Sequence, residues 1–368
     1  MKILYLVSTL ERCGPINVLY NIIQNMDKKR FTPIICTFSS EKSNSCKKEF
    51  EDLGVQIYSF NINGLLPVLI KGKNIKNIVD KINPDVIHSH GIRGDLFTAF
   101  YLKDYYTVST IHNYPYEDYV MAYKKIVGTI MAVINLYAFR KIEFPVACSY
   151  TVSEKIKKKT CKDYKVIQNG IDTNIFSFVD YQQKKEIRQV LEIPKEKNVY
   201  LFLGALIPRK NPTVVIEAFK KFNKNLDSML LIVGDGELYN TCEKHIGTDK
   251  NIKLIGKVNN PEDYYAAADF YIAGSSSEGL PMAVMEAMST GLPVILSDIE
   301  SHREILRSNE TAGLLFECNN IDSLTQKMEQ ILHEEYNVIS LAAYNLISKH
   351  LSAEIMTKKY ERVYEKTY

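Results

Sequence analysis

The sequence predicts an α/β protein made of two doubly wound, Rossmann-like domains that face a central cleft. Short, continuously apolar runs alternate with amphipathic stretches along nearly all of the 368 residues, a pattern typical of parallel sheets with helices on both faces. The pattern occurs twice and is interrupted near Asn169 and Gly170, a turn-forming pair. A chain of this length suits two domains, which we expect over residues 1–168 and 169–351.

The expected strands are short runs rich in aliphatic and aromatic residues. Those of the first domain are residues 2–7, 31–38, 55–60, 85–90, 106–112 and 144–149. Those of the second domain are residues 199–204, 229–236, 252–256, 269–274, 292–297 and 312–316. Helical patterns separate the strands, with the clearest at 211–226 and 323–335. Ligands of such sheets bind at the carboxyl ends of the strands, so we expect a site there.

The composition is that of an ordinary soluble globular protein, with 46% hydrophobic and 24% charged residues. The net charge of +3 does not indicate nucleic acid as a partner. Seven cysteines without a C-x-x-C pair indicate a reducing compartment, with neither a zinc site nor a disulfide framework.

The opening "MKILYLVSTL" leads into the polar "ERCG" rather than a small-residue cleavage site, so we interpret it as a buried strand. No apolar run is long enough to span a bilayer, and we expect a cytoplasmic protein.

Two glutamates stand in the otherwise apolar stretch "SEGLPMAVMEAMSTGLPVI", residues 277–295. A carboxylate in such a setting is costly unless it is hydrogen-bonded. Pro281 suits the first position of a helix, so a loop of small residues would carry Glu278 and the helix would carry Glu286. Backbone N–H groups at a helix N-terminus favour an anion such as phosphate, and carboxylates accept hydrogen bonds from sugar hydroxyls. This combination indicates a nucleotide-sugar site. Composition alone leaves a second interpretation open, in which Glu278 lies on a surface loop and Glu286 is solvated near the helix dipole.

The E-x7-E spacing in "EGLPMAVMEAMSTGLPVI" resembles the signature of glycosyltransferase family 4, whose members are retaining enzymes with a GT-B fold. The stretches "VIQNGID", "GALIPRKNPTVVIEAF", "LLIVGDGEL", "IKLIGKV" and "DYYAAADFYIAGS" resemble the family's second domain in order. "PDVIHSHG", "VSTIHN" and "VACSYTVSEKI" resemble its first domain less specifically. The tail "LSAEIMTKKYERVYEK" resembles the last helix of the fold, so residues 352–368 are expected to pack back onto the first domain.

The resemblance implies a role for each matching residue. Glu278 would bind hydroxyls of the donor sugar, Glu286 would bind the ribose, and Lys210 would bind the pyrophosphate. His112 would line the sugar side of the cleft, although it could equally be a polar residue that ends a strand. We expect Glu278, His112 and Lys210 to act in catalysis. The main-chain and small donor-binding positions are Gly14, Gly204, Gly256, Lys257, Val258, Gly279, Leu280, Pro281 and Met282, with 256–258 near the base and 279–282 near the sugar.

The sequence departs from the family pattern in two loops. Cys13 replaces one of the two usual glycines beside Gly14, and the following acidic residue is absent. Ala205 stands where the family usually carries an arginine that shares the pyrophosphate with the lysine. Arg209 is the expected substitute, since its planar fork suits phosphate. The alternative is that Arg209 points to solvent and merely precedes a helix.

The chemistry implied by the resemblance needs positive charge beside the departing phosphate. The chain has no D-x-D motif. His88 and His90 would share one face of a strand, but no third metal ligand is visible. We therefore expect neither a metal nor another cofactor, the nucleotide sugar being a substrate. The resemblance implies retention of configuration by front-face attack without a covalent intermediate.

We expect a retaining hexosyltransferase that passes a hexose or N-acetylhexosamine from a nucleotide diphosphate sugar, by analogy a UDP-sugar, to a glycan or polyprenyl-linked acceptor in surface polysaccharide biosynthesis. Two alternatives remain open. One is a sugar-nucleotide epimerase of the same fold. The other is an inactive family member that acts as a partner subunit, although the presence of Glu278, Glu286 and Lys210 argues against it.

Two basic and apolar segments suggest peripheral contact with the inner face of the cell membrane. Residues 123–144 carry basic pairs, Lys124–Lys125 and Arg140–Lys141, on either side of an apolar middle. Residues 65–82 add Lys71, Lys73, Lys76 and Lys81. Basic residues beside apolar surface can hold a protein on anionic lipid. The competing interpretation of 123–144 is a long helix of the core.

Overall fold

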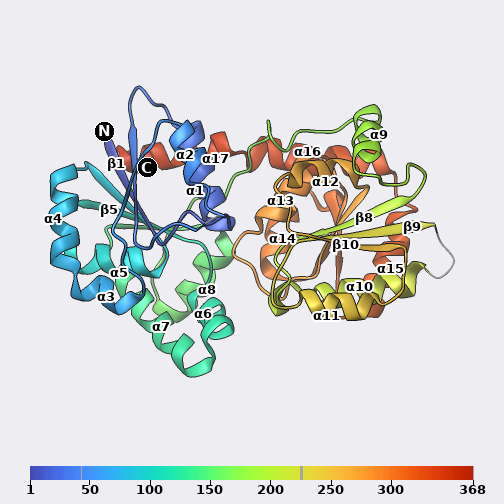
Figure 1. The fold of residues 1–368 in the computed structure, drawn as a ribbon, viewed down its shortest axis with the longest axis horizontal. Helices are drawn as coiled ribbons and strands as arrows, with labels where there is room; N and C mark the ends of the chain where they lie inside the picture. The colour runs from blue at the N-terminus through green and yellow to red at the C-terminus, as the bar shows by residue number, and fades with distance from the viewer. Residues whose placement is uncertain (43, 224–226, 368) are drawn as a thin grey trace. The chain divides into compact units, whose positions relative to one another are not determined.

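The computed structural model divides into two compact units, each built around its own parallel sheet (Figure 1). The structure describes residues 1–42, 44–223 and 227–367. Unit 1 comprises Met1–Asn169 with the C-terminal segment Ala353–Tyr368, and unit 2 comprises Gly170–Ser352. Each boundary lies one residue beyond the boundary expected from the sequence. The predicted class, two doubly wound α/β domains, is confirmed.

Unit 1 contains a seven-stranded sheet in the order β3-β2-β1-β4-β5-β6-β7. Its strands are β1 (Lys2–Val7), β2 (Thr32–Thr37), β3 (Gln56–Ser59), β4 (Val86–His90), β5 (Tyr106–Ile111), β6 (Phe144–Ala147) and β7 (Lys165–Val166). The two-residue strand β7 was not expected, because it lies in the stretch that we interpreted as the join between domains. The strand order reverses between β1 and β4, and the loops that follow these two strands leave the sheet at that point.

Helices cover both faces of the first sheet. They are α1 (Gly14–Asn25), α2 (Lys47–Asp52), α3 (Leu65–Ile70), α4 (Gly72–Ile82), α5 (Ile92–Tyr101), α6 (Pro115–Tyr123), α7 (Lys125–Phe139), α8 (Tyr150–Thr160) and α17 (Ala353–Tyr364). Leu4 and Leu6 of β1 pack with buried residues of α3, α4 and α5. Side chains alternate along a strand, and Tyr5 accordingly faces the other side, where its hydroxyl lies 3.1 Å from that of Tyr364 on α17. The C-terminal helix is therefore part of the core of unit 1.

Unit 2 contains a six-stranded sheet in the order β10-β9-β8-β11-β12-β13. Its strands are β8 (Asn198–Leu203), β9 (Ser228–Val233), β10 (Ile252–Gly256), β11 (Phe270–Ala273), β12 (Val294–Ser297) and β13 (Gly313–Phe316). Its helices are α9 (Tyr181–Val190), α10 (Pro212–Phe222), α11 (Tyr239–Ile246), α12 (Pro261–Ala267), α13 (Met282–Ser289), α14 (Glu300–Leu306), α15 (Ile321–Ile331) and α16 (Tyr336–His350), with short 3-10 turns η1 (Pro208–Lys210) and η3 (Glu310–Ala312). Here the order reverses between β8 and β11.

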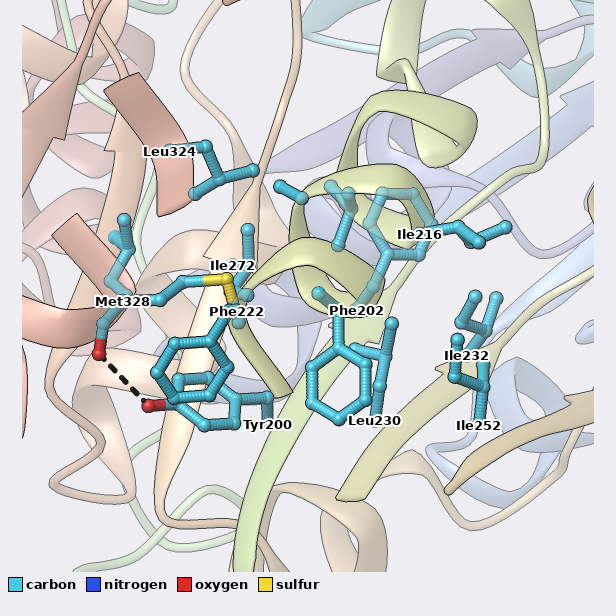
Figure 2. Packing of buried hydrophobic residues seen from close by; sticks show 14 of the residues in the cluster. Tyr200, Phe202, Ile216, Phe222, Leu230, Ile232, Ile252, Ile272, Leu324 and Met328 are labelled. Atoms are coloured by element: carbon cyan, nitrogen blue, oxygen red, sulfur yellow. Dashed lines mark hydrogen bonds between the residues drawn. The ribbon is translucent and has the colours of Figure 1, made fainter. Parts of the chain in front are cut away.

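A dense aromatic and aliphatic core holds the central strand of unit 2 in place. Phe202 of β8 and Ile272 of β11 are among its buried members, together with residues of α10 and α15 (Figure 2). The hydroxyl of Tyr200 donates a hydrogen bond to the carbonyl of Met328 on α15 at 3.1 Å, so the one polar atom of this ring is satisfied. The core therefore fixes the strand from which the next loop, residues 204–211, departs.

Three details of the helices differ from the expectations. The helix expected at 211–226 is α10, Pro212–Phe222, and residues 224–226 lie outside the described part of the chain. The helix within 123–144 is α7, Lys125–Phe139, because Lys124 has a positive φ of 66° and separates α6 from α7. Pro281 is the residue before α13 rather than its first residue. In the described residues, no helix is both long and apolar enough to cross a membrane.

Candidate active site

The loops that follow β8 and β11 meet in unit 2 because these strands are neighbours at the reversal of the sheet order. The loop after β8 runs through residues 204–211 and contains Arg209 and Lys210 in the short turn η1. The loop after β11 runs through residues 274–281 and contains Glu278. Sheet topology thus brings together residues that are almost 70 positions apart in the sequence.

Glu278 forms ion pairs with both cations of the other loop. Its Oε1 lies 2.5 Å from Lys210 Nζ, and its Oε2 lies 2.7 Å from Arg209 Nη1. The same Arg209 nitrogen donates to the carbonyl of Ser277 at 2.8 Å. The Glu278 side chain is only 7% exposed, and those of Arg209 and Lys210 are about one-fifth exposed. The interpretations that place Glu278 on a solvated surface loop and Arg209 in solvent are therefore wrong. We call these three residues the ion cluster.

The ion cluster keeps a buried carboxylate ionised. Burial by itself raises the pKa of Glu278, but Lys210 and Arg209 outweigh it and lower the pKa to about 2. One carboxylate and two cations leave a net charge of +1 at neutral pH. The cluster can therefore attract a further anion while Glu278 remains a hydrogen-bond acceptor.

Hydrogen bonds between the two loops hold the ion cluster in place. The backbone N–H of Ser276 donates to the carbonyl of Arg209 at 2.8 Å. The side-chain amide of Asn211 donates to the carbonyl of Gly274 at 2.8 Å. Asn211 adopts a left-handed backbone, with φ of 50°, directly before α10, a conformation that Asn tolerates better than most residues. The loop of small residues that carries Glu278 is thus hydrogen-bonded to the first loop.

Glu286 is buried in α13 and is held by an aromatic neighbour. The hydroxyl of Tyr265, on α12, donates to Glu286 Oε2 at 2.9 Å. Glu286 is 7% exposed, so the interpretation that it is solvated is also wrong. The nearby Tyr271 of β11 has a pKa that is well above its ordinary value because of burial and then of Glu286 and Glu278. Tyr271 is thus close enough to both glutamates to be affected by their charges.

A small pocket opens where the two loops meet α13. Its wall includes side chains from the two loops and α13, and from strands β8 and β11: Leu203, Lys210, Tyr271, Ser275, Pro281 and Val284. The predicted main-chain positions Gly279, Leu280, Pro281 and Met282 form the entry to α13. Pro281 has no N–H, so the backbone N–H groups at this helix start come from the residues around it.

The remaining unit 2 candidates, Gly204 and residues 256–258, lie at the ends of β8 and β10. Gly204 follows β8 with φ of 158°, and its carbonyl lies so close to Gly234 that a Cβ there would meet it at 1.9 Å. Gly256 ends β10 with φ of 84°, which favours glycine, and is followed by the exposed Lys257 and the half-buried Val258. Strand β10 lies at the edge of the sheet, and β9 separates it from β8. The sheet order therefore sets 256–258 apart from the loop that carries Arg209 and Lys210.

The two candidates of the first domain, His112 and Gly14, both lie in unit 1. His112 directly follows β5, and its Nε2 lies 2.9 Å from His90 Nδ1 at the end of β4. Burial lowers the pKa of His112 to about 4, so its ring is neutral at pH 7. Gly14 is the first residue of α1, and Cys13 before it caps the helix without a side-chain hydrogen bond.

Three further residues of the site were missed by the sequence analysis. Tyr265 and Tyr271 stand in "DYYAAADFY", where three tyrosines within nine residues before the glutamate stretch were a usable signal. His302 of α14 is fully buried, and its Nδ1 lies 2.7 Å from the carbonyl of Ser297. Its pKa is lowered to about 4, chiefly by burial, and it is close enough to Glu278 and Lys210 to be affected by their charges. Nothing in the sequence around His302 indicated its proximity to the site.

Groups suited to a metal ion are not found at these positions. Within residues 1–42, 44–223 and 227–367, no three His, Cys, Asp or Glu side chains are arranged to hold a metal. The charged groups of the ion cluster are instead two cations around one carboxylate. Such a set suits an anionic oxygen ligand, because Arg and Lys form charge-assisted hydrogen bonds with phosphate.

Comparison with known proteins identifies the family. A family model described as "Glycosyl transferases group 1" matches residues 183–345, in unit 2. A model described as "Glycosyltransferase Family 4" matches residues 14–175, chiefly in unit 1. The chain belongs to glycosyltransferase family 4. The resemblance found in the sequence is confirmed for both units of this glycosyltransferase.

Individual relatives agree with this assignment. The glycosyltransferase is 28% identical over 306 residues to the Escherichia coli UDP-Gal:alpha-D-GlcNAc-diphosphoundecaprenol alpha-1,3-galactosyltransferase, covering 79% of this chain and 76% of that protein. It is 24% identical over 379 residues to the Staphylococcus aureus capsular polysaccharide biosynthesis glycosyltransferase CapH, covering 97% and 99%. The crystal structure of Anabaena Alr3699/HepE in complex with UDP-glucose matches the whole of both chains with a TM-score of 0.83 at 18% identity. The fold is thus GT-B, as expected.

Proposed function

We propose that this glycosyltransferase transfers a hexose or N-acetylhexosamine from a UDP-sugar to a glycan or polyprenyl-linked acceptor in the synthesis of a surface polysaccharide. The observation that carries the proposal is the ion cluster at the strand-order reversal of unit 2, beside the buried Glu286. The Escherichia coli relative is named for a UDP-Gal donor and a diphosphoundecaprenol-linked acceptor, and HepE binds UDP-glucose in its crystal. These relatives support transfer rather than epimerisation.

In the proposed donor complex, the pyrophosphate binds Arg209 and Lys210 and competes with Glu278 for them. Glu278 stays ionised because its pKa is low, and its oxygens then accept hydrogen bonds from hydroxyls of the donor sugar. Glu286, oriented by Tyr265, accepts hydrogen bonds from the ribose. Backbone groups complete the proposed site: those of 279–282 near the sugar, 256–258 near the base, and Gly14 and Gly204 near the phosphates. His112 contacts the sugar.

The proposed reaction proceeds with retention of configuration. The bond between the anomeric carbon and the β-phosphate oxygen breaks while a bond to the acceptor oxygen forms on the same face of the sugar. The proton of the acceptor hydroxyl passes to the departing phosphate oxygen, and no covalent enzyme intermediate forms. Arg209 and Lys210 stabilise the charge that develops on the phosphate. Because these cations can supply that stabilisation, we propose that transfer does not require a metal.

The experiment that tests this function is a donor screen with and without acceptor. The protein is incubated with UDP-sugars, and free UDP is measured with and without a polyprenyl diphosphate sugar. We expect acceptor-dependent UDP release that persists in EDTA, and a product whose anomeric signal in NMR has the donor's configuration. An epimerised donor without UDP release would support the epimerase. No release with any donor and acceptor would contradict the proposal, and Mg²⁺-restorable loss in EDTA would contradict its metal-independent form.

We also propose that the enzyme works at the inner face of the cell membrane, held there by α7. This helix buries one side against unit 1 and exposes a second apolar side. The exposed residues follow helical spacing and are Ile126, Val127, Ile130, Val133, Ile134 and Tyr137. Ile126 is the most exposed of these six residues, at 77%. Lys124 and Lys125 precede this apolar stripe and Arg140 and Lys141 follow it, an arrangement that complements anionic lipid. Helix α7 thus packs one side in unit 1 but, unlike a helix of the core, leaves an apolar side exposed.

Sedimentation with vesicles tests the membrane proposal. We expect the wild-type protein to sediment at low salt with vesicles that contain phosphatidylglycerol, and the double variant Ile130→Glu with Val133→Glu to stay in solution. The matched control is Val338→Glu with Leu341→Glu, a pair with the same spacing on α16 and similar exposure, which should bind as the wild type does. No sedimentation of the wild type would contradict the proposal, as would equal loss in both double variants.

A further inference from the structure

Three histidines lie together at the ends of the neighbouring strands β4 and β5, and they are bonded unequally. Both ring nitrogens of His88 are occupied, with Nδ1 2.9 Å from the hydroxyl of Tyr364 and Nε2 2.8 Å from that of Thr110. His90 is bonded through Nδ1 alone, to His112 Nε2 at 2.9 Å. Its Nε2 is buried without a hydrogen-bond partner in the described residues. We call His88, His90 and His112 the histidine cluster.

The rings of the histidine cluster are neutral at physiological pH. Burial is the largest cause of low pKa values in all three, bringing that of His112 to about 4 and that of His88 to about 3, with His90 well below its ordinary value. A neutral imidazole carries one N–H and one lone pair. The 2.9 Å contact between His90 and His112 therefore contains one proton, and one of the two rings donates it.

The two possible positions of that proton differ in what they leave at His90 Nε2. If His112 donated from Nε2, the proton of His90 would sit on its own Nε2, and a buried N–H would have no partner. If His90 donates from Nδ1, its Nε2 carries only a lone pair. Unpaired buried N–H groups are rarer than underused acceptors, and leaving a buried donor unsatisfied is costly. We infer that His90 donates its Nδ1–H to His112 Nε2 and thereby fixes His112 in the tautomer with its proton on Nδ1.

The inferred tautomer defines what His112 offers to a ligand. His112 Nδ1 has no hydrogen-bond partner in the described residues, and it is not among the fully buried unpaired atoms. Its N–H is therefore a free donor, suited to an oxygen that accepts: a sugar hydroxyl, the carbonyl of an N-acetyl group or the carboxylate of a uronic acid. That the ligand is the donor sugar rests on the proposed function. His90 is then a positioning residue, which acts on the sugar only through His112.

The isosteric pair His90→Asn and His90→Asp tests this inference. Both replacements remove the same ring volume from a buried position. The amide of Asn can still donate to His112 Nε2, whereas the carboxylate of Asp can only accept and requires a proton on Nε2. The ¹⁵N NMR spectrum of the histidine side chains distinguishes protonated from unprotonated ring nitrogens in the protein without ligand. The signals of His112 are identified as those that are absent from the spectrum of the variant His112→Asn. We expect the proton on Nδ1 in the wild type and in His90→Asn, and a protonated Nε2 in His90→Asp.

Kinetics then test whether the tautomer matters for transfer. We expect His90→Asp to lower kcat about tenfold or more, as the loss of one ligand hydrogen bond predicts, while His90→Asn retains most of it. Tyr101→Phe removes another hydrogen bond of unit 1, from its hydroxyl to the carbonyl of Leu69, and serves as the control for destabilisation, with kcat unchanged. A wild-type proton on His112 Nε2, or equal kcat for the Asn and Asp variants, would overturn the inference. If the tautomer is as inferred but His112→Ala transfers sugar normally, the role proposed for His112 fails instead.

Discussion

The ion cluster of unit 2 lies at the reversal of strand order and the histidine cluster of unit 1 lies one strand beyond it, and their buried groups are stabilised in opposite ways. Both lie at the carboxyl ends of neighbouring parallel strands, β8 with β11 and β4 with β5. In the ion cluster, Glu278 remains charged because two cations pair with it. In the histidine cluster, no charge is kept, because burial lowers the pKa of each ring.

The difference indicates a division of labour between the two clusters. A charged group in a water-poor site responds strongly to the charge of a ligand, so the ion cluster is suited to the phosphates and to the charge that develops on them. Neutral rings interact weakly with the charge of a ligand, but their hydrogen bonds depend strongly on geometry, because the donor, its hydrogen and the acceptor must be nearly in line. The histidine cluster is therefore suited to orienting a sugar. The predictions below test this contrast, beginning with the largest expected effect.

The strongest test of the contrast is the removal of the cation that contacts Glu278 Oε1. Lys210→Ala should lower kcat/KM by about 10²–10³, the range seen when one stabilising group is removed from a developing anion. Lys244→Ala, an exposed lysine of α11, is the control and should be indistinguishable from the wild type. A Lys210→Ala enzyme with normal kcat/KM would show that the ion cluster is a structural ion pair.

The second test asks whether Arg209 shares the role of Lys210. Arg209→Ala should impair turnover nearly as much as Lys210→Ala, because both cations contact the same carboxylate. Ala205→Arg in that background should restore part of the loss, since Ala205 is exposed in the same loop and arginine can bind phosphate through two hydrogen bonds. Steady-state kinetics with a fixed acceptor measure both effects. Full activity of Arg209→Ala would leave Lys210 to bind the pyrophosphate alone.

The third test separates the clusters by pH. The pKa of Glu278 falls from 4.5 to about 2 on folding, so its contribution is present above pH 4.5 and is lost as pH falls towards 2. The pKa of His112 falls from 6.5 to about 4 on folding. As the pH falls, His112 is protonated in the unfolded chain at a higher pH than in the folded chain. The free energy of unfolding therefore decreases between pH 6.5 and pH 4. Each contribution is on the order of 3 kcal/mol.

Urea unfolding midpoints at closely spaced pH values measure both windows. Glu278→Gln should reduce the slope of the profile between pH 4.5 and 2, and His112→Asn should reduce the slope between pH 6.5 and 4, where His88, His90 and His302 also contribute. The exposed Glu334→Gln is the control for the first variant. A Glu278→Gln profile that matches the wild type between pH 4.5 and 2 would contradict the pairing that we assign to the ion cluster.

The smallest expected effect concerns Glu286, which is buried like Glu278 but is held by a neutral hydroxyl. Glu286→Ala should weaken UDP binding about tenfold, since the ribose loses its acceptor. Tyr265→Phe should weaken it less, by roughly threefold, because the carboxylate remains but is no longer oriented. Calorimetric titration with UDP gives both values. Tighter or unchanged binding in Glu286→Ala would remove Glu286 from the proposed donor site.

Sequence analysis predicted the fold well because strand and helix patterns depend mainly on local residues. The buried runs at 2–7 and 199–204 match β1 and β8 closely. Differences occurred where one residue decides the local backbone: Lys124 adopts a positive φ, so the helix in the segment 123–144 begins only at Lys125, and Pro281 precedes α13 instead of opening it. Periodicity cannot register such single-residue events, since it averages over several turns of helix.

For the site, the sequence by itself determined which residue types were available and that Glu278 and Glu286 are unusual in an apolar stretch. It also determined, through the matching motifs, the family to which the chain belongs. It could not determine that Glu278 bridges both Arg209 and Lys210, that Tyr265 holds Glu286, or that His90 faces His112. These pairs come from different strands and helices, and only the order of strands in each sheet brings them within hydrogen-bonding distance. The charge of Glu278 and the tautomer of His112 could not be determined from the sequence either. Both depend on burial and on hydrogen-bonding partners, which exist only in the folded chain.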